Sequence, residues 1–304
     1  MTVDDRSSEL IDLTPGRTSG AVWVQSDLQL GRPALAREVL ANAVADMEAL
    51  DEPVDAIWCL GDALVGSREA DLAEVAAACI ELLESFDVPI CYVMGNHEMD
   101  LRCTGTRCYP LYEQVAGRPL WHTMAKLEDP WFERQCLGCR AVFFGDHADP
   151  AGQWLTQHHG LKPTDATYPH TAAWPRLRDR LARAAEPVVF AGHYAFPGGQ
   201  RPSDLMGQLL PLPETVRLHL HGHAHIGDMV HNREHPWRRN NPITGQPQRQ
   251  YNISALETAR SPGSHSALLR FDAGEPARLD IRCHLQQQWV ERFELTGRPA
   301  STGS

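Results

Sequence analysis

Five short apolar runs along the chain each end in a polar motif, and this repeated arrangement most limits the folds that the chain can adopt. The first three runs, at 21–24, 56–60 and 90–94, alternate with stretches of helical periodicity at 33–50 and 69–86. The order strand, helix, strand predicts parallel strands joined by helical crossovers. The carboxyl ends of such strands meet at one edge of an open sheet, where α/β folds bind ligands, so we expect the motifs to gather there.

The polar motifs carry residue types that bind metal ions. Imidazole is the commonest metal ligand among side chains, and a glycine precedes several candidate ligands. A residue without Cβ lets the chain turn sharply and bring the next side chain toward a shared centre. The mixture of nitrogen and oxygen donors suits Mn²⁺, Fe or Zn²⁺ better than a metal that prefers thiolates. The motifs are Asp27-x-Gln29, Gly61-Asp62, Gly95-Asn96-His97-Glu98, Gly192-His193 and Gly222-His223-Ala224-His225.

The remaining elements follow from the same patterns. A charged helix is expected over 174–185 and a short helix near 204–209. The last three strands of the chain are expected to form an antiparallel set. The strands expected in the second half are 141–144, 188–191, 216–220, 251–253, 267–271 and 279–285.

The chain shows no internal repeat and no low-complexity linker, which favours one domain over 21–296. Residues 1–20 and 297–304 are expected to be a flexible arm and a flexible tail. A polar insertion at 229–249 contains several arginines and a tryptophan. It would cap the site and hold an anion through bidentate arginines, or it would be a solvated loop or an oligomer contact, and the sequence does not choose among these.

Charge and hydropathy limit the partners and the compartment. The formal net charge of −11 argues against long nucleic acid, because phosphate backbones bind clustered Lys and Arg. A small anionic substrate still fits if metal ions receive it. No signal-peptide core and no run long enough to span a bilayer is present, so we expect a cytoplasmic protein. The eight cysteines are then expected to be mostly reduced thiols, and the oligomeric state is not indicated.

In their order and separation, the five motifs resemble those of the calcineurin-like metallophosphoesterase superfamily. The similarity covers roughly residues 20–260, and the motifs at 95–98 and 222–225 are intact. The resemblance implies an α/β fold, a four-layer α/β/β/α sandwich of two mixed sheets, with a two-metal site along one edge. By position it implies that Asp62 bridges both ions, that one ion is held by Asp27, Gln29 and His225, and that the other is held by Asn96, His193 and His223.

Gln29 departs from the family pattern, because most members have histidine there. An amide oxygen is a weaker donor than imidazole and shifts the preference toward Mn²⁺ or Mg²⁺. One interpretation is a degenerate fold that acts as an interaction module. The other is a functional ligand, as in the manganese-dependent ADP-ribose/CDP-alcohol pyrophosphatases, whose first motif this one resembles. Every other ligand position is filled, which favours two bound divalent ions, with Mn²⁺ first and Fe, Zn²⁺ or Mg²⁺ as alternatives.

The resemblance implies hydrolysis of a phosphate ester or phosphoanhydride bond in a nucleotide or a biosynthetic phosphate, by a hydroxide that bridges the ions. His97 would protonate the leaving group or stabilise the phosphate oxygens, and Glu98 or another carboxylate would orient its ring. Arg102 and Tyr194 lie near the motifs and are candidate substrate contacts, although a loop position without a binding role explains them equally well. The acidic charge disfavours a nuclease.

Four cysteines in the middle of the chain form two pairs with metal-site-like spacing, Cys103 with Cys108 and Cys136 with Cys139. The spacing of the first pair is loose for a structural zinc site. Leu137-Gly138, between the second pair, is typical of a hairpin turn that leads into the strand at 141–144. Free thiols or an incidental disulfide are therefore favoured over zinc.

Overall fold

The computed structural model describes residues 10–29, 32–64, 69–95, 97–98, 110–125, 131–144, 173–193, 212–223, 225, 238–239, 250–258 and 263–295. The helix expected near 204–209, the tail at 297–304 and most of the insertion at 229–249 lie outside these residues. The same is true of five residues singled out from the sequence, which are Asn96, Arg102, Tyr194, Cys103 and Cys108.

The described residues form helices and strands in both halves of the chain. In chain order they are β1 (Gly20–Gln25), α1 (Pro33–Glu48), β2 (Ala56–Cys59), α2 (Glu69–Glu84), β3 (Ile90–Tyr92), α4 (Pro110–Val115), β4 (Trp121–His122), β5 (Trp131–Cys136), β6 (Cys139–Phe144), α5 (Ala173–Ala182), β7 (Val188–Gly192), β8 (Val216–His221), β9 (Arg238–Arg239), β10 (Gln250–Asn252), β11 (His265–Asp272), β12 (Glu275–Cys283) and β13 (Gln288–Glu294). None of the described helices has both the length and the apolar composition of a membrane span.

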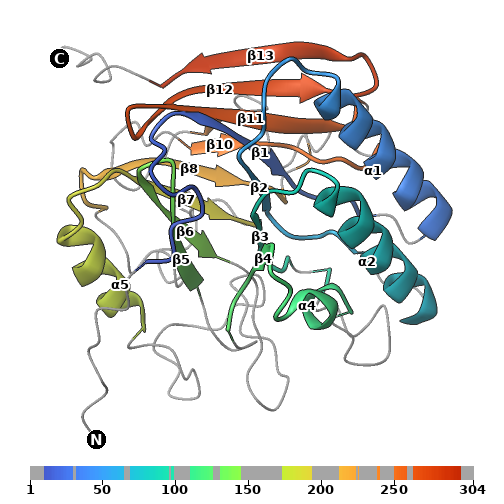
Figure 1. Cartoon of the computed structure of the whole chain (residues 1–304), viewed down its shortest axis with the longest axis horizontal. Coiled ribbons are helices and arrows are strands. Elements are labelled where there is room, and N and C mark those ends of the chain that lie inside the picture. Colours follow the sequence, from blue (N-terminus) through green and yellow to red (C-terminus); the bar gives the residue numbers. More distant parts are fainter. Residues whose placement is uncertain are drawn as a thin grey trace, which may run out of the picture.

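Two mixed sheets pack face to face between two layers of helices, which is the expected α/β/β/α arrangement (Figure 1). The first sheet has the strand order β13-β12-β11-β1-β2-β3-β4, and the second has β5-β6-β7-β8-β10-β9. Helices α1, α2 and α4 lie on the side of the first sheet, and α5 lies on the side of the second. Trp58 of β2 meets Phe143 of β6 edge to face, with ring centroids 5.2 Å apart, so this aromatic pair joins the two sheets in the core.

The first half of the chain folds as its periodicity predicts. β1 pairs in parallel with β2, and β2 with β3, with α1 and α2 as the crossovers. Pro33 occupies the first turn of α1, where a missing N–H costs no hydrogen bond. Helix α1 then buries Val39, Leu40, Val44 and Met47, which recur at helical spacing on the face turned toward the core.

Beyond β3, one expectation is wrong, and the sequence did not predict α4, β4, β5, β9 or β13. β10 does not join β11 and β12 as expected, because it pairs in parallel with β8 and antiparallel with β9 and so belongs to the second sheet. β12 pairs antiparallel with both β11 and β13, and β11 also pairs antiparallel with β1. β5 and β13 were not predicted, since their charged sequences WFERQC and QWVERFE lack an apolar run.

A two-residue turn joins β5 to β6, as Leu137-Gly138 predicts. Both turn residues have positive φ, 51° at Leu137 and 78° at Gly138, as a type I′ hairpin requires. The turn places Cys136 directly opposite Cys139 in the pairing register. Both are buried free thiols, and so are the other cysteines of the described residues, which agrees with reduced thiols at these positions.

Residues 10–20 differ from the loose arm that we expected over 1–20. The backbone of Leu13 donates to the carbonyl of Gln135 at 2.8 Å, and the Gln135 N–H donates to Ile11 at 2.9 Å. Leu13 is 7% exposed and packs into the main core. The Arg17–Asp55 ion pair and a hydrogen bond from Leu137 N to Thr14 Oγ1 add to these contacts. The sequence shows no periodicity that would predict them.

Two buried histidines make the stability of the fold depend on pH. Burial lowers the pKa of His219 to about 3 and that of His265 to about 4, the latter also because His284 lies close. The unfolded chain, with histidine pKa near 6.5, therefore binds more protons below neutrality. The stabilisation is complete above pH 6.5 and is lost as the pH falls toward 4. We expect about 1–2 kcal/mol to be lost per histidine at pH 5, measured as a lower urea midpoint. An unchanged midpoint between pH 7 and 5 would contradict this.

Candidate metal centre

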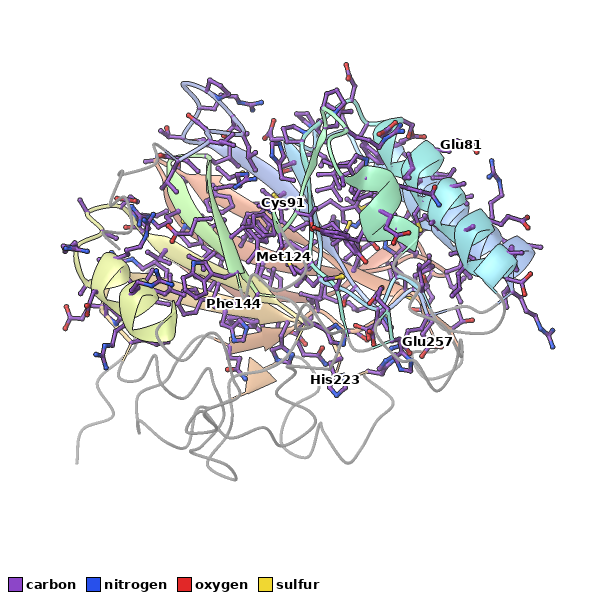
Figure 2. The ribbon with its side chains drawn as sticks, turned by 90° about the horizontal axis from the view of Figure 1, so that it is seen from below. Glu81, Cys91, Met124, Phe144, His223 and Glu257 are labelled. Carbon is purple, nitrogen blue, oxygen red and sulfur yellow. The ribbon has the colours of Figure 1, made fainter. Side chains whose placement is uncertain are left out.

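The polar motifs meet where the carboxyl ends of β1, β2, β3, β7 and β8 come together. Backbone hydrogen bonds join the first two motifs, since Asp27 N donates to Gly61 O at 3.0 Å and Gln29 N donates to Asp62 O at 3.1 Å. In Figure 2, His223 of the last motif lies at the lower side of the described part of the chain, near the ends of the strands. The parallel order of the strands thus brings residues that are far apart in sequence to one edge.

Asp62 lies at the middle of the cluster and is fully buried. Its Oδ2 is 3.1 Å from Nε2 of His193 and 3.9 Å from Nε2 of His97. Donor atoms of Asp62, His193 and His223 all lie within 4.8 Å of one another, which is close enough for one ion to contact all three. Burial raises the pKa of the Asp62 carboxyl, but the neighbouring His193 and His97 outweigh it and hold the pKa below its ordinary value.

The ring of His193 is oriented for metal binding. Its Nδ1 lies 2.9 Å from the carbonyl oxygen of Leu60, which only accepts hydrogen bonds, so Nδ1 carries the proton. Nε2 of the neutral ring then presents a lone pair toward Asp62. A metal-binding histidine typically has its second nitrogen fixed in this way.

Asp27 forms the second half of the cluster and is also fully buried. Its Oδ1 is 3.2 Å from Nε2 of His225. The side-chain amide of Gln29 lies between the two carboxylates, with Nε2 3.2 Å from Oδ1 of Asp27 and also within hydrogen-bond distance of Asp62. Gln29 Oε1 is buried and has no hydrogen-bond partner among the described residues. Rotating the amide would turn this oxygen toward the two carboxylates, where an oxygen is favourable only if a cation lies between them.

Several residues of the cluster have an unusual backbone conformation. Asp27, Gln29, Asp62 and His223 have φ values of 55°, 39°, 53° and 61°. Each such residue costs about 1–2 kcal/mol, and non-glycine residues in this region cluster at functional sites. The strain is local to the ends of the strands, where it directs these side chains toward one another.

The glycines of the motifs allow close approach as well as tight turns. A Cβ on Gly95 would lie 2.2 Å from Oδ1 of Asp62, and a Cβ on Gly222 would lie 2.4 Å from Oδ2 of Asp27. Atoms cannot approach so closely, so a side chain at either position would displace a carboxylate. Buried carboxylates, imidazole nitrogens and an amide oxygen together make a donor set that fits divalent cations of the Mn²⁺, Fe or Zn²⁺ type.

Comparison with known proteins agrees with this geometry. The sequence profile of the calcineurin-like phosphoesterases matches residues 20–227, which is more than half of the chain. The chain belongs to the calcineurin-like phosphoesterase family. Membership supports metal-dependent hydrolysis of phosphoesters in general terms. No protein of curated function matches the sequence significantly.

Solved structures confirm the fold of the chain. Plasmodium GAP50, described as the anchor in the inner membrane complex, has a TM-score of 0.52 at 14% identity, with 94% of this chain and 91% of that chain covered. The purple acid phosphatase PPD1 from yellow lupin seeds also has a TM-score of 0.52, at 13% identity, covering 91% of this chain. The chain spans about half the length of the lupin enzyme, since 53% of that enzyme is covered. At these identities the similarity is one of fold.

Glu98 has a different role from the one that we expected. Its carboxylate accepts three backbone N–H groups, from Asp62 at 2.9 Å, Leu64 at 3.1 Å and Gly95 at 2.7 Å. It therefore ties the end of β2 to the end of β3, and does not orient the ring of His97, whose Nδ1 has no hydrogen-bond partner among the described residues. Burial and the nearby Asp62 raise the pKa of Glu98.

Glu257 is a site residue that the sequence did not predict. Its Oε1 lies 2.8 Å from Nδ1 of His225, and its backbone N–H donates to the carbonyl of Asp27 at 3.0 Å. The available signal was the apolar run at 251–253, because a strand parallel to β8 would end at the same edge. An antiparallel strand would not end at this edge, so the expected antiparallel pairing of 251–253 did not point to Glu257.

The structure brings together most of the predicted site residues. Asn96, Arg102 and Tyr194 lie outside the described residues, so their predicted roles stay predictions. The residues found in one cluster are Asp27, Gln29, Asp62, His97, His193, His223 and His225.

Proposed function

We propose that the chain is a hydrolase that cleaves a phosphate ester or phosphoanhydride bond in a small phosphorylated molecule with two divalent ions, Mn²⁺ foremost. Asp27, Gln29 and His225 would hold one ion, and Asn96, His193 and His223 the other, with Asp62 between them. The observation that carries the proposal is the convergence of two fully buried carboxylates, Asp27 and Asp62, on imidazole nitrogens. Divalent ions in such a centre supply Lewis acidity and lower the pKa of bound water toward neutrality.

The side chains of the cluster would compensate the charge of the ions, bind them and supply a proton. The buried carboxylates compensate cationic charge in a place where an uncompensated charge would be costly. The side chains of His193 and His225 are at most 3% exposed, as structural ligands are. The side chain of His97 is 25% exposed, with Nε2 directed toward Asp62, so it is accessible to a substrate at the cluster. It is the candidate to protonate the leaving group.

Replacing His97 with alanine is expected to leave metal content unchanged and to lower turnover by about 10²–10⁴-fold on substrates with poor leaving groups. Esters of p-nitrophenol should lose less, because p-nitrophenolate leaves without protonation. Measuring kcat for both substrate types, with bound Mn²⁺ counted by elemental analysis, separates acid catalysis from metal loss. Equal activity of the variant and the wild type on every substrate would remove His97 from the mechanism.

The proposed function is tested directly with the purified chain. Turnover of p-nitrophenyl phosphate, bis-p-nitrophenyl phosphate and ADP-ribose is measured with Mn²⁺ and with a chelator. We expect Mn²⁺-dependent hydrolysis of at least one, and the pattern distinguishes monoesters, diesters and anhydrides. No turnover of any of them, in a protein that binds Mn²⁺, would count against a small-molecule hydrolase and favour the second candidate.

The second candidate is an interaction module that kept the fold without turnover. Gln29 favours it, since a weak donor stands in the place of a histidine, and so does the fold similarity to GAP50, which is described as an anchor. The intact cluster around Gln29 supports the hydrolase instead, because both carboxylates and the strained backbone are retained. A nuclease is less well supported, given the net charge of −11. The free thiols of the described residues support a reducing compartment, which we propose to be the cytoplasm.

A further inference from the structure

We propose that Glu257 is a positioning residue that strengthens His225 as a metal ligand and thereby compensates for the weak amide donor at Gln29. The inference rests on the proposed function, because it concerns the ion that Asp27, Gln29 and His225 would hold. The hydrogen bond between the Glu257 carboxylate and the His225 ring carries the inference. It reaches the ring on the side away from the proposed ion, so Glu257 would act through His225 and not as a ligand itself.

The geometry around His225 allows one protonation state for a metal ligand. Nδ1 lies 2.8 Å from Oε1 of Glu257, and both side chains are nearly sealed from solvent, at 3% and 2% exposure. With the proton on Nδ1 and donated to the carboxylate, Nε2 presents its lone pair toward Asp27, 3.2 Å away. Figure 2 shows Glu257 at the same lower edge of the molecule as His223.

His193 and His225 differ in the group that lies behind the imidazole ring. His193 donates its Nδ1 proton to a neutral backbone carbonyl, that of Leu60. His225 donates to a carboxylate, which raises the electron-donating power of the ring more strongly. The carboxylate occurs on the side that contains Gln29, where a neutral amide replaces the stronger imidazole donor. The negative charge of Glu257 thus strengthens His225 and offsets the weaker amide donor of Gln29.

The backbone holds Glu257 firmly in this position. Its own N–H donates to Asp27 O at 3.0 Å, and the N–H of Leu256 donates to Ser26 O at 3.0 Å. The segment after β10 therefore runs along the first motif, bonded to it at consecutive residues. Glu257 contacts one proposed ligand with its backbone and another with its side chain, so it fixes their relative position.

The test is a double-mutant cycle on Mn²⁺ binding to the full chain. Wild type, Glu257→Gln, Gln29→His and the double variant are stripped with a chelator and titrated with Mn²⁺ by calorimetry, with bound ions counted by elemental analysis. We expect Glu257→Gln to weaken one of the two sites by about 10–100-fold and to leave the other unchanged. In the Gln29→His background the same change should weaken that site by only a few-fold, since imidazole restores a strong donor.

Two further variants control for the fold and for charge. Glu133→Gln removes a carboxylate that is also nearly buried, at 6% exposure, but that binds Arg140 and Arg180 away from the cluster, and it should leave both affinities unchanged. Glu257→Asp keeps the charge on a shorter side chain and should fall between wild type and Glu257→Gln. If Glu257→Gln does not fold, as judged by circular dichroism, the aspartate variant carries the comparison.

The outcomes separate this inference from the proposed function. Wild-type affinities at both sites of Glu257→Gln would overturn the inference. An equal loss in the wild-type background and in the Gln29→His background would also overturn it, because Glu257 would then not compensate for the amide. A wild-type chain that binds no Mn²⁺ or other divalent ion would overturn the proposed function, and the inference with it.

Discussion

Asp62→Asn is expected to lower the turnover of phosphoester substrates by about 10³-fold or more and to reduce the number of bound Mn²⁺ ions. Asp62 is fully buried, and its carboxylate contacts both His193 and the amide of Gln29. Asparagine keeps the size of the side chain but removes the charge and replaces one acceptor oxygen with a donor. The proposed ions would lose the ligand that joins them, so the effect should exceed that of any other single neutral substitution in the cluster.

The measurement combines kcat with elemental analysis of bound Mn²⁺. Asp51→Asn is the matched control, since Asp51 is exposed and lies in the loop after α1, and it should behave as the wild type. Asp62→Asn also keeps the acceptor for the His97 backbone N–H, which donates to Oδ1 at 2.7 Å, so the fold should be maintained. An Asp62→Asn protein with full metal content and full turnover would show that the centre lies elsewhere.

The second large effect concerns stability, and its origin is a buried polar network behind the first sheet. Asp46 of α1 accepts two hydrogen bonds from Arg282, at 2.9 and 2.6 Å, and one from Nδ1 of His284 at 2.8 Å. Nε2 of His284 lies 2.8 Å from Oγ of Ser266, which also accepts the indole N–H of Trp23 at 2.8 Å. Burial raises the pKa of Asp46, but Arg282 and His284 outweigh it and lower the pKa to about 2.

The spacing of Ser266, His284 and Asp46 is that of a catalytic triad, but the surroundings exclude catalysis. Ser266 is fully buried, and the Trp23 N–H occupies its oxygen. A nucleophile must be accessible to the substrate, and this one is not. The network instead joins α1 to β11, β12 and β1 with each hydrogen bond made inside the core.

Asp46→Ala is therefore expected to destabilise the protein by about 3–5 kcal/mol, because it leaves the Arg282 guanidinium buried without its partner. Urea denaturation measures the difference. Arg37→Ala is the control, since Arg37 and Glu81 form an ion pair whose side chains are 49% and 62% exposed, and its loss should leave the urea midpoint close to that of the wild type. A loss below about 1 kcal/mol for Asp46→Ala would mean that water reaches Arg282 in the folded state.

The sequence predicted those site residues that directly follow an apolar run and lie at the carboxyl end of a parallel strand. Each strand end that carries a metal-type motif follows an apolar run, so the position of Asp62 or His193 follows from the run and the rule for parallel sheets. Glu257 has no such signal, because its role depends on the pairing of β10, a strand of three residues. Three residues are too few for periodicity to distinguish a parallel from an antiparallel strand.

The elements of the fold were likewise predictable only where the sequence has apolar periodicity. The helices and central strands have clear apolar periodicity, whereas β5 and β13 carry charges on exposed or half-buried positions and are stabilised by pairing with a neighbour. The polar network around Asp46 could not be predicted either. Its members come from α1, β1, β11 and β12, and no spacing in the chain relates them.

The carboxylate of Glu98 has a consequence for the rigidity of the strand ends at the cluster. Because it binds the backbone at the ends of β2 and β3, these ends keep their arrangement through hydrogen bonds within the chain itself. If divalent ions bind at this cluster as proposed, we expect the main chain at Asp62 and Gly95 to change little between the empty and the loaded protein, because Glu98 already holds both residues.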